Sequence, residues 1–252
     1  MLHSYEGTRI VRLSQTLVLK GGINARPCEA NIMELVRGKG GSTIAVPKVY
    51  RVLNIETENV YFGCQCMFVM DFGEGRSVEE CWEGLSEAER VDVVAQVASM
   101  ITALQSIPVP QQPGPVGCTT CLAQGFWFTD MGAGPFGLKE EMEAWFNRKL
   151  AICKNFKQAP EEVPPFHFDK LVLTHQDIAP RNLILGSDQK VWIIDWGDAG
   201  IYPAGFEVAS LNARRFSAPI FTDMLLDMIP KHEEMVQQLR WIMFALTTGQ
   251  YL

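Results

Sequence analysis

The chain has 252 residues, 47% hydrophobic and 20% charged, which is the composition of a globular protein with one large core or two smaller ones. Its net charge of -7 and the lack of a basic stretch argue against a general nucleic-acid-binding protein. No apolar run approaches the ~20 residues that a membrane-spanning helix needs. We therefore expect neither a nucleic-acid partner nor a membrane partner.

The N-terminal part of the sequence predicts a hairpin. Alternating apolar residues occur in the segments 8–12 and 15–20, on either side of a short turn. The second segment ends at Lys20. A lysine that closes an aliphatic strand can carry its ammonium group into a cleft and contact phosphate oxygens. Taken alone, however, an edge lysine that faces water is the simpler interpretation.

A helix is expected from Pro27 to Arg37, because proline is tolerated at the first helical position and apolar residues then recur at helical spacing. Glu29 lies in its first turn, where it would either pair with Lys20 or only complement the helix dipole. Glu34 is a competing partner for the lysine. We favour an ion pair between Lys20 and Glu29, because a cluster of acids follows further along the chain.

The middle of the chain predicts two more strands and two long helices. The strands are residues 46–53 and 66–72, and a Gly-x-Gly turn follows the second strand. Residues 86–89 form a capping box for a helix that extends to about residue 106. After a loop rich in proline and glycine, residues 138–153 form another helix. Both helices are expected to pack in a core.

Three apolar strands joined by one polar loop and one turn come next. The first strand is residues 171–174, and the last one, which follows a turn at residues 186–190, ends in Asp195. The loop between the first two strands carries Asp177 and Asn182, so these residues should lie beside the end of the strand that carries Asp195. Two carboxylates and one amide would then face one small volume. Such a group can hold Mg²⁺ on a polyphosphate while a base orients a substrate hydroxyl.

This stretch resembles the aminoglycoside phosphotransferase and choline kinase families, which share the protein-kinase fold. His175-x-Asp177-x-x-x-x-Asn182 has the order and spacing of their catalytic loop, and its wording is especially similar to that of phosphotransferase-like proteins of fungi. Ile194-Asp195-Trp196-Gly197 looks like their D-F-G segment. The resemblance implies that Asp177 is the catalytic base, that Asn182 is a metal ligand and that Asp195 is the main metal ligand. His175 is a further candidate in the same loop.

The resemblance also implies an ATP site. Lys20, paired with Glu29, would contact the phosphates. Residues 67–75 look like the hinge between the lobes of a kinase, and four residues would surround the adenine ring through a backbone carbonyl, a backbone N–H and two apolar side chains, namely Asp71, Gly73, Met70 and Ile184. A strand that ends at a glycine turn explains the same residues without a ligand. The adenine site therefore rests on analogy.

The implied fold class is α+β: a bilobal protein-kinase-like fold with a small antiparallel-sheet N-lobe at residues 1–72 and a larger, mainly helical C-lobe at residues 73–252. The N-terminus is short, and only Gly7 precedes Lys20 where the family has a glycine-rich phosphate lid. It therefore stays open whether the small lobe is truncated by one strand. Only a short connection follows Asp195, which favours a small-molecule acceptor over a protein substrate.

The expected function is therefore an ATP- and Mg²⁺-dependent phosphotransferase that acts on a hydroxyl group of a small molecule. One alternative is a non-catalytic kinase-like protein that binds a nucleotide or a metabolite, and another is the same cleft reused for a different small-molecule reaction. Several acids are compatible with a cationic, amine-bearing acceptor, namely Glu74, Asp130, Asp198 and Glu207. Asp198 could equally join the metal site or cap a turn.

The 7 cysteines form no small-domain framework, and no signal peptide is recognisable at the N-terminus. Reduced thiols in a cytoplasmic protein are the simplest interpretation. Cys118-x-x-Cys121 could indicate zinc or redox chemistry, but no second pair has zinc spacing. A chance match is the better interpretation of this motif.

Overall fold

The computed structural model describes residues 3–5, 7–22, 24–54 and 66–252, and the chain divides into two compact units. Unit 1 comprises Met1–Ala103, Val116–Cys118 and Ala179–Gly197. Unit 2 comprises Leu104–Pro115, Thr119–Ile178 and Asp198–Leu252. The lobe boundary expected after residue 72 stays a prediction.

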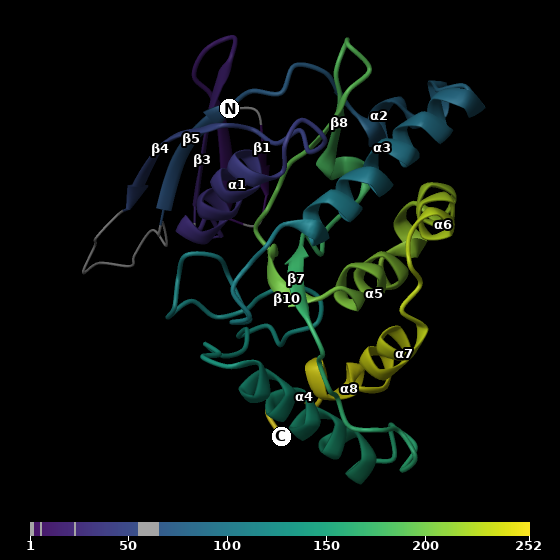
Figure 1. The fold of residues 1–252 in the computed structure, drawn as a ribbon. Helices are drawn as coiled ribbons and strands as arrows, with labels where there is room; N and C mark the ends of the chain where they lie inside the picture. The colour runs from purple at the N-terminus through teal and green to yellow at the C-terminus, as the bar shows by residue number, and fades with distance from the viewer. Residues whose placement is uncertain (1–2, 6, 23, 55–65) are drawn as a thin grey trace. The chain divides into compact units, whose positions relative to one another are not determined.

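An antiparallel sheet of five strands forms the first part of unit 1 (Figure 1). The strands lie in the order β1-β2-β3-β5-β4, with the bounds His3–Tyr5, Thr8–Arg12, Leu17–Gly22, Cys66–Asp71 and Val49–Asn54. The predicted hairpin is thus present as β2 and β3. The structure adds β1, which pairs with β2 so that Tyr5 lies opposite Thr8. The family resemblance implies a glycine-rich phosphate lid in this region. Only two residues separate β1 from β2, and one of them is Gly7.

Helix α1 (Pro27–Lys39) packs its apolar face against this sheet (Figure 1). Ile32, Met33 and Val36 are all at most 1% exposed, as is Phe68 on β5. Ile32 and Met33 precede Val36 by four and three residues, so the three side chains lie on one stripe of the helix, which is buried. The N–H of Gly40 donates to the carbonyl of Val36 and ends the helix.

Unit 1 also contains a second sheet, of three strands, two of which follow Asn182 in the sequence. Its order is β6-β8-β9, with bounds Arg76–Ser77, Leu183–Leu185 and Val191–Ile193. β8 and β9 form the predicted hairpin, in which Gly186 N–H donates to the Lys190 carbonyl at 2.9 Å. The same unit contains α2 (Val78–Cys81) and most of α3 (Glu87–Ser106). The predicted capping box opens α3, because Ser86 and Glu89 exchange hydrogen bonds of 2.8 and 3.3 Å.

Unit 2 consists of one strand pair and several helices. β7 (Leu171–Thr174) pairs with β10 (Gly200–Pro203), which the sequence did not predict as a strand. The helices are α4 (Lys139–Asn155), α5 (Gly205–Ala213), α6 (Pro219–Met228), α7 (Glu233–Trp241) and α8 (Met243–Leu246). Aromatic rings fill the core between them, including Tyr202 and Phe206, which stack at 6.0 Å. Among the helices of the described residues, none is long and apolar enough to cross a membrane.

The cysteines differ from the expected state at two positions. Cys28, Cys66, Cys81 and Cys153 are free and buried, as reduced thiols should be. Cys118 and Cys121, however, are disulfide-bonded, so the expectation of reduced thiols is wrong for these two. Cys64 lies outside the described residues.

Candidate active site

Lys20, Glu29 and Asp195 form an ion triad in unit 1. Lys20 lies on β3 and is only 5% exposed. Its Nζ is 2.6 Å from Glu29 Oε1 and 2.6 Å from Asp195 Oδ1. The predicted ion pair with Glu29 is therefore present. The competing residue Glu34 is exposed on the other side of α1.

The surroundings of the triad explain its charges. Burial acts to lower the pKa of Lys20, but the two carboxylates outweigh it and raise the pKa above its usual value, so the ammonium stays charged. Burial raises the pKa of Glu29, whose Oε2 has no hydrogen-bond partner among the described residues. Asp195 differs from both, because 49% of its side chain is exposed. The triad thus presents one carboxylate that a ligand can reach.

The β8–β9 hairpin places Asn182 and Asp195 at the same end. Asn182 immediately precedes β8, and its carbonyl accepts the N–H of Ile194 at 3.0 Å. Asp195 then follows with a φ of 63°, a left-handed conformation that non-glycine residues adopt mainly where the surroundings enforce it. The guanidinium of Arg26, at the start of α1, donates to the carbonyl of Gly197 and so fixes the backbone two residues after Asp195.

The residues expected around adenine also lie in unit 1. Met70 is buried on β5 and 8% exposed. A Cβ placed on Gly73 would lie 3.8 Å from Ile184 Cγ2, so the chain after β5 runs against β8. The Asp71 carboxylate accepts the Lys48 N–H and the Tyr50 hydroxyl, each at 2.9 Å, and is therefore held towards β4.

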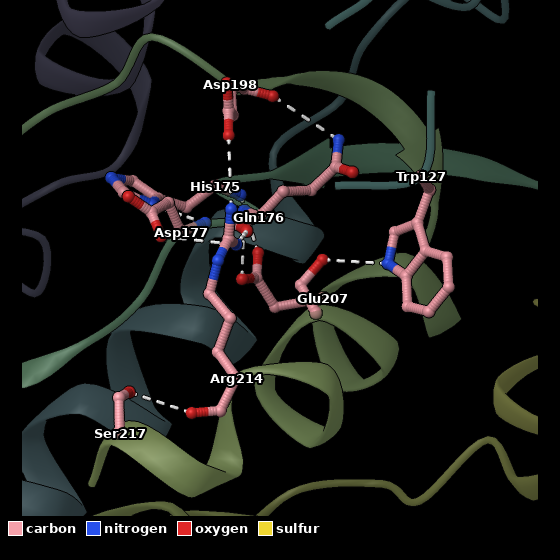
Figure 2. Close-up of polar contacts among 9 residues, drawn as sticks. Trp127, His175, Gln176, Asp177, Asp198, Glu207, Arg214 and Ser217 are labelled. Carbon is pink, nitrogen blue, oxygen red and sulfur yellow. Dashed lines mark hydrogen bonds and ion pairs between the residues drawn. The ribbon is translucent and has the colours of Figure 1, made fainter. Parts of the chain in front are cut away.

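The part of the loop that carries Asp177 belongs to unit 2 and is anchored by Glu207 (Figure 2). Glu207 lies on α5 and is completely buried. Its two carboxylate oxygens accept the backbone N–H groups of His175 at 2.6 Å and Gln176 at 3.0 Å. Burial raises the pKa of Glu207 to about 7, although both N–H donors act against this rise. The His175 ring adds a third constraint, because its Nδ1 accepts the Asp177 N–H at 3.2 Å.

Arg214 lies between two carboxylates of unit 2 (Figure 2). Its Nη1 is 3.2 Å from Asp177 Oδ1, and its Nη2 is 3.6 Å from Asp198 Oδ2. The same guanidinium donates to the carbonyl of Gln176. The ring of Phe126 lies 5.4 Å from its central carbon. One cation thus neutralises part of the charge of both acids.

Comparison with known families places this geometry in context. The sequence model of the phosphotransferase enzyme family, APH, matches residues 6–229, which is most of the chain. The chain belongs to this family. The resemblance inferred from the catalytic-loop motif is therefore confirmed. A comparison of this chain with curated proteins found no match.

Solved structures of aminoglycoside phosphotransferases share its fold. A thermostable mutant of APH(4)-Ia in the apo form superposes with a TM-score of 0.65 at 14% identity, covering 99% of this chain and 87% of that one. A ternary complex of such a mutant with AMP-PNP and hygromycin B gives 0.64 at 14% identity, with 99% and 86% covered. The gentamicin complex of APH(2")-IIa gives 0.55 at 15% identity, with 94% and 78% covered. The predicted kinase-like α+β fold is confirmed.

Within this phosphotransferase fold the predicted site residues fall into two groups. Lys20 contacts both Glu29 and Asp195, and Asn182 lies at the end of the same hairpin as Asp195. Asp177 and Asp198 lie in unit 2, together with His175. That Asp177 and Asp195 face one volume stays a prediction, as do the catalytic, nucleotide-binding and metal-binding roles.

Sequence reasoning missed three residues around these groups. Glu207 was considered only as a binder of amines, although an acid in the apolar run Gly205-Phe-Glu-Val-Ala-Ser-Leu211 could have indicated a buried carboxylate with a structural partner. The sequence contains no recognisable signal for Arg26 or Arg214, because each of them contacts a residue that lies far away in the sequence.

Proposed function

We propose that this phosphotransferase transfers the γ-phosphoryl group of ATP to a hydroxyl group of a small molecule, with Mg²⁺ as the metal ion. The observation that carries the proposal is the ion triad: a buried lysine fixed by Glu29 and directed at the half-exposed carboxylate of Asp195. The solved structures with AMP-PNP and hygromycin B, and with gentamicin, support a nucleotide and a hydroxyl-bearing acceptor for this fold. Four free, buried thiols agree with a cytoplasmic location, where ATP is available, whereas the disulfide between Cys118 and Cys121 does not.

The oxygen atoms near the triad fit a magnesium ion. Mg²⁺ prefers oxygen ligands and usually binds through one or two carboxylates together with substrate phosphates and water. Asp195 supplies a carboxylate with 49% of its side chain exposed, and the backbone of Asn182 lies at the same hairpin end, so we propose its side-chain amide oxygen as a second ligand. In the part of the chain that the structure describes, no group of three or more His, Cys, Asp or Glu side chains could hold a metal by itself. Bound there with ATP, Mg²⁺ would neutralise phosphate charge.

The residues of the chain then have distinct tasks. Lys20 neutralises phosphate charge, and Glu29 keeps the ammonium in position. Asp177 accepts or orients the proton of the acceptor hydroxyl, while the anchored loop holds its carboxylate still. Met70, Asp71, Gly73 and Ile184 are proposed to hold the adenine ring. Positioning and charge neutralisation dominate phosphoryl transfer, so the protein needs little covalent chemistry.

Thermal denaturation with ATP tests the proposed nucleotide site. We expect ATP plus Mg²⁺ to raise the Tm of the wild type more than ATP with a chelator does, because ligand at about 100 times its Kd stabilises the folded state by about 2.7 kcal/mol. Asp195→Ala should lose the Mg²⁺-dependent part of this rise. The control Asp169→Ala removes an acid whose side chain is 96% exposed and should behave as wild type.

The proposal fails if millimolar ATP with Mg²⁺ leaves the wild-type Tm unchanged. It also fails in its metal assignment if Asp195→Ala retains the full Mg²⁺-dependent rise. The Tm of each variant without ligand must be measured alongside, because Asp195→Ala also removes one partner of the buried Lys20.

A further inference from the structure

Arg26 stands at a helix start where a cation does not help the helix. It immediately precedes α1, and its side chain accepts no hydrogen bond from the first turn. Serine, threonine, aspartate and asparagine are preferred at this position, because their side chains accept backbone N–H groups of that turn. A positive charge also lies unfavourably next to the positive end of the helix dipole. Helix stability therefore does not explain an arginine here.

Arg26 instead contacts a distant segment of unit 1. Its backbone is extended, with a φ of -125° and a ψ of 145°, which is the usual conformation of a residue that precedes a proline, here Pro27. The half-buried side chain donates to the carbonyl of Gly197, 171 residues further along the chain. Hydrogen bonds from a charged donor are stronger than those between neutral groups. The contact thus ties the start of α1 to the segment that follows Asp195.

The Gly197 backbone lies beside the carboxylate that we propose as a metal ligand. A Cβ placed on Gly197 would lie 3.8 Å from Asp195 Oδ1. Asp195 has a φ of 63°, a conformation that its surroundings must maintain. On the N-terminal side, the β8–β9 hairpin fixes the N–H of Ile194, and next to Asp195 the ring of Trp196 is completely buried. Arg26 fixes the backbone on the C-terminal side.

Helix α1 therefore reaches Asp195 by two routes. Glu29, in the first turn, fixes Lys20, whose Nζ is 2.6 Å from Asp195 Oδ1. Arg26 fixes the backbone two residues after Asp195. The first route acts on the carboxylate itself, and the second acts on the main chain that aims it. A half-exposed carboxylate that is held at both points keeps one orientation.

We propose that Arg26 is a positioning residue for the metal: by holding the carbonyl of Gly197, it keeps the Asp195 carboxylate in the orientation that binds Mg²⁺ on the nucleotide. This inference rests on the proposed function, in which Asp195 is a metal ligand. Groups that orient a metal ligand typically contribute about 10- to 100-fold to metal affinity. An arginine that bound the phosphates directly would instead act on ATP with or without the metal.

Calorimetric titration with AMP-PNP, with Mg²⁺ or with a chelator, tests the inference. We expect wild type to bind AMP-PNP more tightly with Mg²⁺. In Arg26→Ala and Arg26→Ser, the Kd with Mg²⁺ should rise by at least about tenfold, because the carboxylate is no longer held. The Kd with the chelator should stay as in wild type, since Lys20 and Glu29 are unchanged.

The two variants separate positioning from helix stability. Both lose the contact with Gly197, but serine is a good N-cap and alanine a poor one, so Arg26→Ser should have the higher Tm without ligand. A merely structural role predicts that nucleotide binding follows this order, whereas positioning predicts an equal loss in both. Arg26→Lys keeps a cationic donor and should recover part of the affinity. The control Arg37→Ala removes an exposed arginine from the last turn of α1 and should bind as wild type does.

Hydrogen exchange of the ligand-free proteins adds a measurement that needs neither metal nor nucleotide. Peptides that cover residues 194–197 should exchange faster in Arg26→Ala and Arg26→Ser than in wild type, because the backbone there loses a tether. Helix α4, which belongs to unit 2, should exchange equally in all three proteins.

Three results would overturn the inference: variants that keep the wild-type Kd with Mg²⁺, an equal loss of affinity with Mg²⁺ and with the chelator, or unchanged exchange at residues 194–197. If alanine and serine prevent folding, Arg26→Lys decides, because it must then bind more weakly than wild type only when Mg²⁺ is present. A wild type that binds AMP-PNP equally with and without Mg²⁺ contradicts the proposed function as well. A wild type that responds to Mg²⁺, beside variants that respond equally, contradicts this inference alone.

Discussion

Lys20 keeps its charge although only 5% of the residue is exposed. Two carboxylate oxygens at 2.6 Å make this possible, since an unpaired buried ammonium would instead lose its proton. The sequence anticipates the partner Glu29, because a strand lysine followed by an acid in the first turn of a helix is a local pattern. The direct contact with Asp195 could be expected only through the family resemblance, because 175 residues separate the two.

Glu207 gives a pH-dependent prediction at the residue scale. Its folded-state pKa is about 7, above the ordinary value of 4.5, so the folded protein binds more protons than the unfolded chain between these pH values. Stability from this residue is therefore fully present below about pH 4.5 and is lost as the pH rises through about 7. From pH 5 to pH 8, wild type should lose up to about 3 kcal/mol more unfolding free energy than Glu207→Gln does.

Urea unfolding of both proteins at pH 5 and pH 8 measures this difference. Other titrating groups are common to the two proteins and cancel in the comparison. If wild type instead gains stability relative to Glu207→Gln as the pH rises, the N–H donors from His175 and Gln176 outweigh burial, and the pKa of Glu207 is lowered rather than raised.

The packing of strands β1, β2 and β3 of unit 1 depends on a close approach between two glycines, Gly7 and Gly22. β1 and β2 are joined through Gly7, and β3 ends at Gly22, which has a φ of 131°. A Cβ on Gly22 would lie 1.9 Å from the Gly7 carbonyl oxygen, a distance that no side chain can occupy. The end of β3, two residues after Lys20, thus requires glycine for two reasons, namely backbone conformation and space.

Two glycine substitutions should therefore have opposite effects on stability. Gly22→Ala should lower the unfolding free energy by at least about 2 kcal/mol, because it adds backbone strain to a clash with main chain. Gly38→Ala, on an open face of α1 with no atom within 4 Å of the new Cβ, should raise it by about 0.5–1 kcal/mol through better helix propensity. Chemical denaturation compares the three proteins. Equal effects of both substitutions would contradict the close approach of Gly22 to Gly7.

At the scale of the whole molecule, local sequence patterns predicted the helices and strands better than they predicted the contacts of the candidate active site. The β8–β9 hairpin, the capping box of α3 and the Pro27 start of α1 all follow from residues within a few positions of one another. β10 escaped prediction because its four residues form a strand only by pairing with β7. The same holds for the contacts of Glu207 and Arg214, which depend on how α5 packs beside the catalytic-loop sequence.

The roles of the site residues could be expected only because the order of Lys20, Glu29, Asp177, Asn182 and Asp195 resembles a family. Geometry now supports the pairing within unit 1, and family membership supports the chemistry. The acceptor could not be read from the sequence, since the composition shows acids but not their internal partners. The structure shows those partners, namely Gln250 for Asp130, Arg214 for Asp177 and Asp198, and two backbone N–H groups for Glu207.

Transfer of labelled phosphate tests the central claim most directly. Protein is incubated with γ-labelled ATP, Mg²⁺ and an extract of small metabolites, and labelled products are separated and identified by mass spectrometry. We predict that wild type labels a hydroxyl-bearing small molecule and that Asp177→Asn lowers kcat for this product by ~10²–10⁴ through loss of the base. Unchanged labelling by Asp177→Asn, or no labelled small molecule from a wild type that binds ATP with Mg²⁺, would contradict the account.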